Sequence, residues 1–146
     1  MEDAMSIKPS LTWRIGIGKL VGLLIGVAAY FLLPWFTGQT DALLQWGFLL
    51  WYATMGAFIG VFGVYNWHPI LQLPMPWWLR APLIGGWMNF VLMLLMYDRL
   101  ADIMARFGSD LVRSPGWFVV EGMLLGAFIG WLATRFAGEG IETAGR

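Results

Sequence analysis

From Leu20 to Phe36 the chain runs through apolar residues without a single charged side chain. With the residues in front of it from Leu11, this block is long enough for a helix to cross the hydrocarbon core of a bilayer. The 146 residues are 59% hydrophobic and 12% charged, whereas soluble domains average about 45–50% and about 25%. A soluble core of this size could not enclose the surplus. We therefore expect an all-α integral membrane protein in contact with the lipid bilayer.

Three further apolar blocks follow the first. The expected spans lie at about 13–36, 42–65, 81–97 and 117–136, and the third is at the lower length limit for crossing. Thr40 or Asp41 is a suitable N-cap for the second span. The connector before the third span contains prolines that exclude a continuous helix, namely Pro69, Pro74, Pro76 and Pro82. We predict one transmembrane domain of four spans over residues 1–146.

The residues before the first span resemble the basic region of a signal peptide, since they include Lys8, Arg14 and Lys19. Residues 33–36, Leu-Pro-Trp-Phe, stand where a cleavage site of small residues would be required. We therefore expect the first helix to stay uncleaved.

Basic residues are distributed unequally over the two sides of a four-span chain. One side would carry Lys8, Arg14, Lys19, Arg80, Arg135 and Arg146, and the other Arg99, Arg106 and Arg113. Because Lys and Arg accumulate on the cytoplasmic side, this distribution predicts that both termini are cytoplasmic. We expect the chain in a bacterial inner membrane.

The polar segment 98–113 has the apolar periodicity of a helix. Its apolar face would be formed by Leu100, Ile103, Met104, Phe107 and Leu111, opposite Asp102, Arg106 and Asp110. This pattern predicts an amphipathic interfacial helix that lies on the membrane surface between the third and fourth spans. The alternative is that the third helix extends beyond the membrane through the same residues.

Glycines recur every four residues in three of the spans and would line one face of each helix. They are Gly18, Gly22 and Gly26, then Gly56 and Gly60, and then Gly122, Gly126 and Gly130. Such a glycine zipper lets another backbone approach closely. It could form an interface with a partner subunit or a homo-oligomer, or it could pack the bundle internally. We expect at least one of the three faces to point outward.

The string Gly-Ala-Phe-Ile-Gly occurs at 56–60 and again at 126–130. The same offset places Gly16 over Gly86 and Lys19 over Asn89. Duplication of a two-span unit would give two parallel two-helix repeats. Chance and a shared packing demand explain so short a match equally well.

Three polar residues lie within the predicted spans, namely Glu121, Gln45 and Asn89. Intramembrane carboxyl groups are costly and commonly functional. Counting residues from the span ends places Gln45 at the depth of Glu121 and Asn89 deeper. We therefore expect Gln45 to be the hydrogen-bond partner of Glu121.

The remaining chemistry is sparse. His68 is the only histidine, at the end of the second span, and is a weak candidate for ligating a haem iron or a chlorophyll magnesium. A single histidine at the end of a span is more often an interfacial residue. No cysteine is present, which excludes disulfides and thiolate metal sites. We predict no other cofactor and no metal site.

Two functions remain open. No set of residues for acid-base, nucleophilic or metal catalysis can be assembled, so we expect no enzyme. The balance of nine basic and nine acidic residues gives no indication of nucleic-acid binding. The favoured hypothesis is a structural or accessory subunit that packs through its glycine-striped helices against a larger membrane complex or its own copies. The alternative is an oligomeric small transporter or channel with Glu121 and Asn89 as its polar lining.

Overall fold

The computed structural model describes residues 10–106 and 113–144. Within these ranges the chain is helical, and its elements are α1 (Leu11–Thr37), α2 (Ala42–Phe62), α3 (Trp77–Leu95), α4 (Tyr97–Ala105), α5 (Trp117–Ala137) and the short 3-10 helix η1 (Ile141–Thr143). Four of these, α1, α2, α3 and α5, are long and apolar enough to cross a membrane. They confirm the prediction of four spanning helices and indicate an integral membrane protein.

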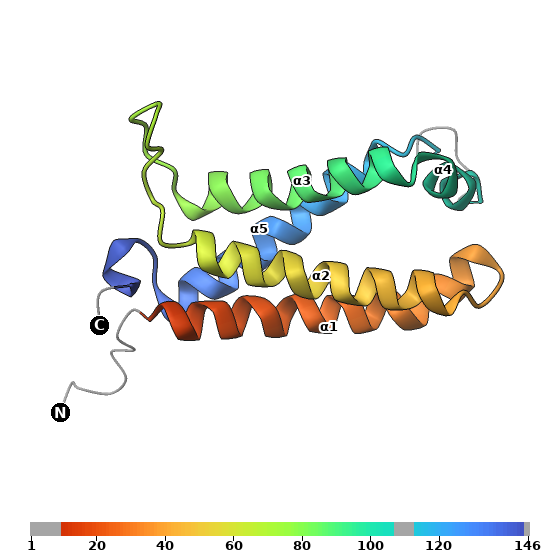
Figure 1. Ribbon diagram of the computed structural model, residues 1–146, viewed down its shortest axis with the longest axis horizontal. Helices are drawn as coiled ribbons and strands as arrows, with labels where there is room; N and C mark the ends of the chain where they lie inside the picture. Colours follow the sequence, from red (N-terminus) through yellow and green to blue (C-terminus); the bar gives the residue numbers. More distant parts are fainter. Residues whose placement is uncertain (1–9, 107–112, 145–146) are drawn as a thin grey trace.

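The four long helices form two tightly packed pairs. α1 packs along α2, and α3 packs along α5, whereas α2 and α3 contact each other little. α5 also contacts α1 and thereby joins the pairs. Figure 1 shows that the start of α1, the end of α5 and the connector between α2 and α3 lie at one end of the bundle. The α1–α2 turn and α4 lie at the other end.

Two of the four spans differ from their predicted bounds. α2 ends at Phe62 rather than at residue 65. α3 begins at Trp77 and ends at Leu95, instead of covering 81–97. Pro82 was assigned to the connector but lies inside α3, where the helix continues around the one backbone donor that proline lacks. Pro76 is the true break, because it is the N-cap of α3.

The turn between α1 and α2 is set by local chemistry. Gly38 ends α1 in the left-handed region at φ 71°, which glycine adopts without a side-chain clash, and its N–H donates to the Pro34 carbonyl. Asp41 is the N-cap of α2 and accepts a hydrogen bond from the Leu44 N–H at 3.1 Å. Arg99 of α4 reaches the same carboxylate at 2.8 Å, which links α4 to this turn.

The amphipathic segment forms a helix separate from α3. The backbone breaks at Met96, and Figure 1 shows α4 turned away from the axis of α3. The alternative of a continuous third helix is therefore wrong. Leu100 is buried in the core, and Met104 packs against it. Phe107, Asp110 and Leu111 lie outside the described residues, and the position of α4 at a membrane surface stays a prediction.

The glycine faces are used inside the chain. A Cβ atom added to Gly56 would overlap the carbonyl oxygen of Gly18, and one added to Gly126 would overlap that of Ala81. All eight glycines of the three predicted faces are buried, namely Gly18, Gly22, Gly26, Gly56, Gly60, Gly122, Gly126 and Gly130. The expectation that one glycine face points outward is therefore wrong, because each of the three is occupied by the neighbouring backbone of the same chain.

The contacts between helices do not repeat with the offset of the sequence match. Gly56 faces the Cα atom of Gly22, whereas Gly126 faces that of Gly85. With an offset of 70 the residue opposite Gly126 would be 92, so the second pair is displaced by seven residues, or about two helical turns. The duplication stays a hypothesis without support from helix register.

A layer of buried apolar side chains crosses the middle of the bundle. Met55, Ile129 and Ala133 have no exposed surface, and Ile59 is 1% exposed. Side chains this well buried leave little room for water. The layer separates the polar groups near Glu121 from the polar groups at the connector end.

Candidate functional site

The structure brings four polar side chains together inside the bundle. The Tyr52 hydroxyl donates to Oε1 of Glu121 at 2.7 Å, and Nδ2 of Asn89 donates to Oε2 at 3.0 Å. The same Asn89 nitrogen donates to the Phe118 carbonyl at 2.9 Å. Nε1 of Trp51 donates to Oδ1 of Asn89 at 3.0 Å. Helices α2, α3 and α5 are thus joined by one hydrogen-bond network.

The predicted partner of Glu121 is wrong. Nε2 of Gln45 donates instead to the Tyr30 carbonyl of α1 at 2.8 Å, and Asn89, judged too deep, contacts the carboxyl directly. Because α3 ends at Leu95, two residues earlier than predicted, Asn89 lies only about 9 Å from that helix end. Side-chain reach covers the remaining difference in depth.

Tyr52 and Trp51 were missed by the sequence analysis. Their positions carried a signal, because both lie mid-helix in α2 rather than at the ends, where membrane Tyr and Trp usually gather. A Tyr or Trp buried at mid-span needs a partner for its hydroxyl or indole N–H. The Glu121 and Asn89 side chains supply those partners.

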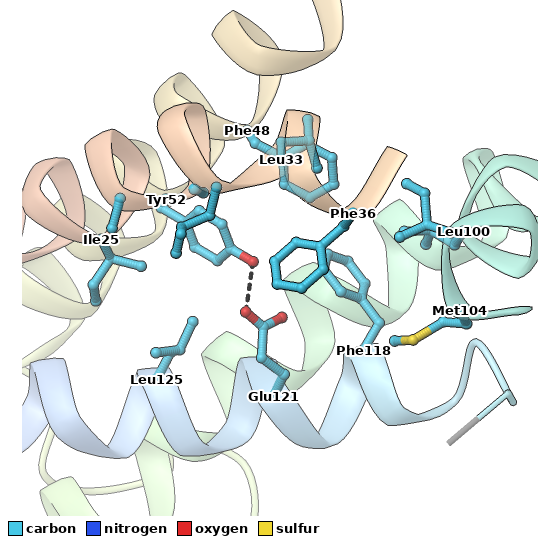
Figure 2. A pocket seen from close by; sticks show the side chains of 14 residues that line it. Ile25, Leu33, Phe36, Phe48, Tyr52, Leu100, Met104, Phe118, Glu121 and Leu125 are labelled. Carbon is cyan, nitrogen blue, oxygen red and sulfur yellow. Dashed lines mark hydrogen bonds between the residues drawn. The ribbon is translucent and has the colours of Figure 1, made fainter. Parts of the chain in front are cut away.

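Glu121 lines a cavity of about 390 Å³ between α1, α2, α4 and α5. Figure 2 shows its carboxyl pointing toward Tyr52, with Phe36, Leu100 and Met104 among the apolar side chains around it. We call this the Glu121 cavity. Its walls are almost entirely apolar, and Glu121 and Tyr52 are the polar side chains among the described residues that line it.

The carboxyl group at this position is satisfied only in part. Each oxygen accepts one hydrogen bond from the protein, and a carboxylate has about four acceptor sites. The described residues that line the cavity include no Lys, Arg or His. A buried negative group without a cationic partner is costly. The site is therefore suited to an apolar molecule that brings a hydrogen-bond donor or a positive charge.

His68 is placed to donate a hydrogen bond rather than to ligate a metal ion. Its Nδ1 accepts hydrogen bonds from the N–H groups of Leu71 at 3.0 Å and Ile70 at 3.3 Å. The neutral ring therefore carries its proton on Nε2. Ligating histidines usually show the reverse, with one nitrogen donating to an acceptor and the other free for the metal. This geometry disfavours His68 as a ligand for haem or chlorophyll.

Two buried arginines close the connector end of the bundle. Nη1 of Arg14 donates to the Thr134 hydroxyl at 3.0 Å and to the Gly138 carbonyl. Arg80 donates to two connector carbonyls and pairs with Glu139 at 2.9 Å. The Arg14 guanidinium lies at the carboxyl end of α5, where the helix dipole favours a positive charge. These contacts fix both guanidinium groups to the ends of the neighbouring helices and to the connector.

Searches with protein-family models, curated proteins and solved structures found no match to this chain. Among the described residues, no group of three His, Asp or Glu side chains is placed to hold a metal ion. The function has therefore to be inferred from the geometry of the chain itself.

Proposed function

We propose that this protein is a small, non-catalytic membrane subunit that binds an amphiphilic molecule in the Glu121 cavity. The molecule would place an apolar body against the cavity walls and an amine or other donor group at the carboxyl. The observation that supports this is a carboxyl group, held by Tyr52 and Asn89, facing an apolar cavity of about 390 Å³. Apolar cavities with a few convergent polar groups are the usual form of small-molecule sites.

Binding fits the geometry better than conduction through one chain. A pore would need a polar path along the bundle, whereas Met55, Ile129 and Ala133 fill its middle. Any transport based on Glu121 and Asn89 would therefore require further copies of the chain or a large rearrangement.

An accessory role toward a larger membrane complex or a homo-oligomer is part of the proposal. The contact surface would differ from the one expected from sequence, because the glycine faces are occupied internally. The outer faces carry large apolar side chains, such as Trp35 and Leu43. We also propose that both termini are cytoplasmic and that the chain resides in a bacterial inner membrane.

The binding proposal is tested with matched single-chain amphiphiles, namely dodecylamine, dodecanol and dodecanoate. A ligand that binds only the folded state raises the thermal midpoint. We expect dodecylamine to raise the midpoint of the detergent-purified protein most and dodecanoate least. Glu121→Gln should remove the advantage of the amine over the alcohol.

The control is Glu142→Gln, which neutralises an exposed glutamate in η1 outside the cavity. It should respond to the three amphiphiles like the wild-type protein. An equal response of wild type and Glu121→Gln to the amine would overturn the proposal.

A further inference from the structure

A second cavity lies where α2 and α3 diverge. It encloses about 1030 Å³, and its walls include Phe58 of α2 and Leu83, Trp87 and Val91 of α3. We call it the α2–α3 groove. Phe58, Leu83 and Trp87 are also among the exposed apolar side chains, so the groove is open along its length to whatever surrounds the bundle. In a membrane-spanning bundle this surrounding is the acyl region of the bilayer.

The groove is as long as one leaflet. Along α2 it extends from Trp51 to Phe62, and along α3 from Arg80 to Val91. Each stretch corresponds to a rise of about 16 Å, whereas the hydrocarbon core of a bilayer is about 30 Å thick. A partner helix crossing the membrane would need a groove of twice this length. An acyl chain from one leaflet needs a groove of only about this length.

The two ends of the groove differ in chemistry. At the connector end it is lined by Tyr65, Trp67 and His68, all of them amphipathic side chains typical of the headgroup region. His68 has its donor on Nε2, because Nδ1 is engaged by the backbone. At the far end Trp51 lines the groove and is fixed by its hydrogen bond to Asn89. The groove thus has a polar entrance at one membrane surface and a closed apolar end near the middle of the bilayer.

We propose that the α2–α3 groove binds one phospholipid of the leaflet at the connector end. An acyl chain would lie between α2 and α3 and end near Trp51. The phosphate would accept hydrogen bonds from Tyr65, Trp67 and His68, because phosphate oxygens are strong acceptors. This proposal does not depend on the Glu121 cavity, which is lined by other residues of α2.

The test is native mass spectrometry of protein extracted in a mild detergent and exposed to phosphatidylglycerol and phosphatidylethanolamine. We expect one phospholipid to remain on the wild-type chain after detergent removal. Leu83→Trp and Val91→Trp fill the groove and should reduce lipid retention about tenfold, since each methylene excluded from apolar burial weakens binding severalfold. Leu124→Trp is the control, because Leu124 is exposed on α5 and lines neither cavity.

The polar entrance is tested separately. Combining Tyr65→Phe with His68→Phe removes two donors but keeps an aromatic ring at each position, and it should weaken phospholipid retention while a detergent molecule of equal chain length is still retained. Equal retention of phospholipid by all variants would overturn the proposal. So would a changed oligomeric state of Leu83→Trp with unchanged lipid content, which would identify the groove as a protein interface.

Discussion

Two glycines of α2 differ sharply in the atoms that an added methyl group would contact. At Gly56 an added Cβ would overlap the backbone carbonyl of Gly18, whereas at Gly47 nothing lies within 4 Å. Both residues belong to α2. The first position therefore sets the distance between two helices, and the second packs against none of the described residues.

We expect Gly56→Ala to lower the free energy of unfolding by about 1–3 kcal/mol, the usual cost of overpacking. Gly47→Ala should leave it unchanged or raise it by up to about 1 kcal/mol, since alanine favours a helix more than glycine does. Chemical unfolding in mixed micelles, followed by circular dichroism, measures both. Equal effects of the two substitutions would contradict the assignment of the Gly18–Gly56 contact.

The sequence was sufficient to select Glu121 and Asn89 but not their partnership. A polar residue within an apolar block can be recognised from the sequence, but the side chains that it contacts cannot. Depth counted along a helix carries an error of several ångströms when the helix ends are uncertain. Tyr52 was overlooked because a tyrosine counts as an aromatic residue in an apolar block, so that its hydroxyl does not stand out as a polar group. Which side of α2 faces α5 depends on packing that no local pattern contains.

α4 is held to the bundle by both apolar and ionic contacts. Leu100 is buried in the core, and Arg99 pairs with Asp41 at the start of α2. The hydrogen bond from the Leu44 N–H, followed by that from Arg99, lowers the pKa of Asp41 below its ordinary value. Of these two contacts, the Leu44 bond caps α2 and the Arg99 pair joins α2 to α4.

The lowered pKa gives a pH dependence with a defined sign. The carboxylate of Asp41 contributes stability that is fully present above its unfolded pKa of about 3.9 and is lost as the pH falls through the lower folded pKa. We expect the thermal midpoint of wild type to exceed that of Asp41→Asn at neutral pH, with the difference shrinking as the solution becomes acidic.

The control is Asp102→Asn, which removes an exposed carboxylate from α4. At neutral pH, the difference in thermal midpoint between Asp102→Asn and wild type should be smaller than that between Asp41→Asn and wild type. A difference for Asp41→Asn that is independent of pH would show that the Arg99 pair contributes nothing, since asparagine retains the N-cap acceptor.

Helix number and type were predictable because apolar length alone identifies a span. The start of α3 was not, since Pro82 looks like a breaker in the sequence but is tolerated where only one backbone hydrogen bond is lost. The change from apolar to amphipathic residues near 98 predicts where α4 begins, but no proline or glycine marks the backbone break at Met96. It becomes apparent only when Leu100 is seen packed against the bundle.

The four-span arrangement predicts which positions lie on each side of the membrane. The connector, the start of α1 and the end of α5 lie at one end of the bundle, and α4 lies at the other (Figure 1). The chain has no cysteine, so a single introduced thiol can be labelled cleanly. We expect an impermeant maleimide applied from the periplasmic side of spheroplasts to label Asp102→Cys but not Ile70→Cys.

Both positions are exposed in the folded chain. The control is labelling after permeabilisation, when both variants should react. Labelling of Ile70→Cys alone from the periplasmic side would reverse the proposed orientation and leave the four-span arrangement intact.

The buried Arg14 has a consequence for the order of synthesis. Its acceptor Thr134 is 120 residues further along the chain, and Gly138 is 124 residues away. While α1 is being inserted, neither partner has been made. The guanidinium therefore remains at a membrane surface, where water and lipid headgroups solvate it. It can turn inward only after α5 arrives beside α1. The first helix of the bundle therefore gains this contact only after the last spanning helix has been made, and a chain truncated before Thr134 lacks both acceptors of Arg14.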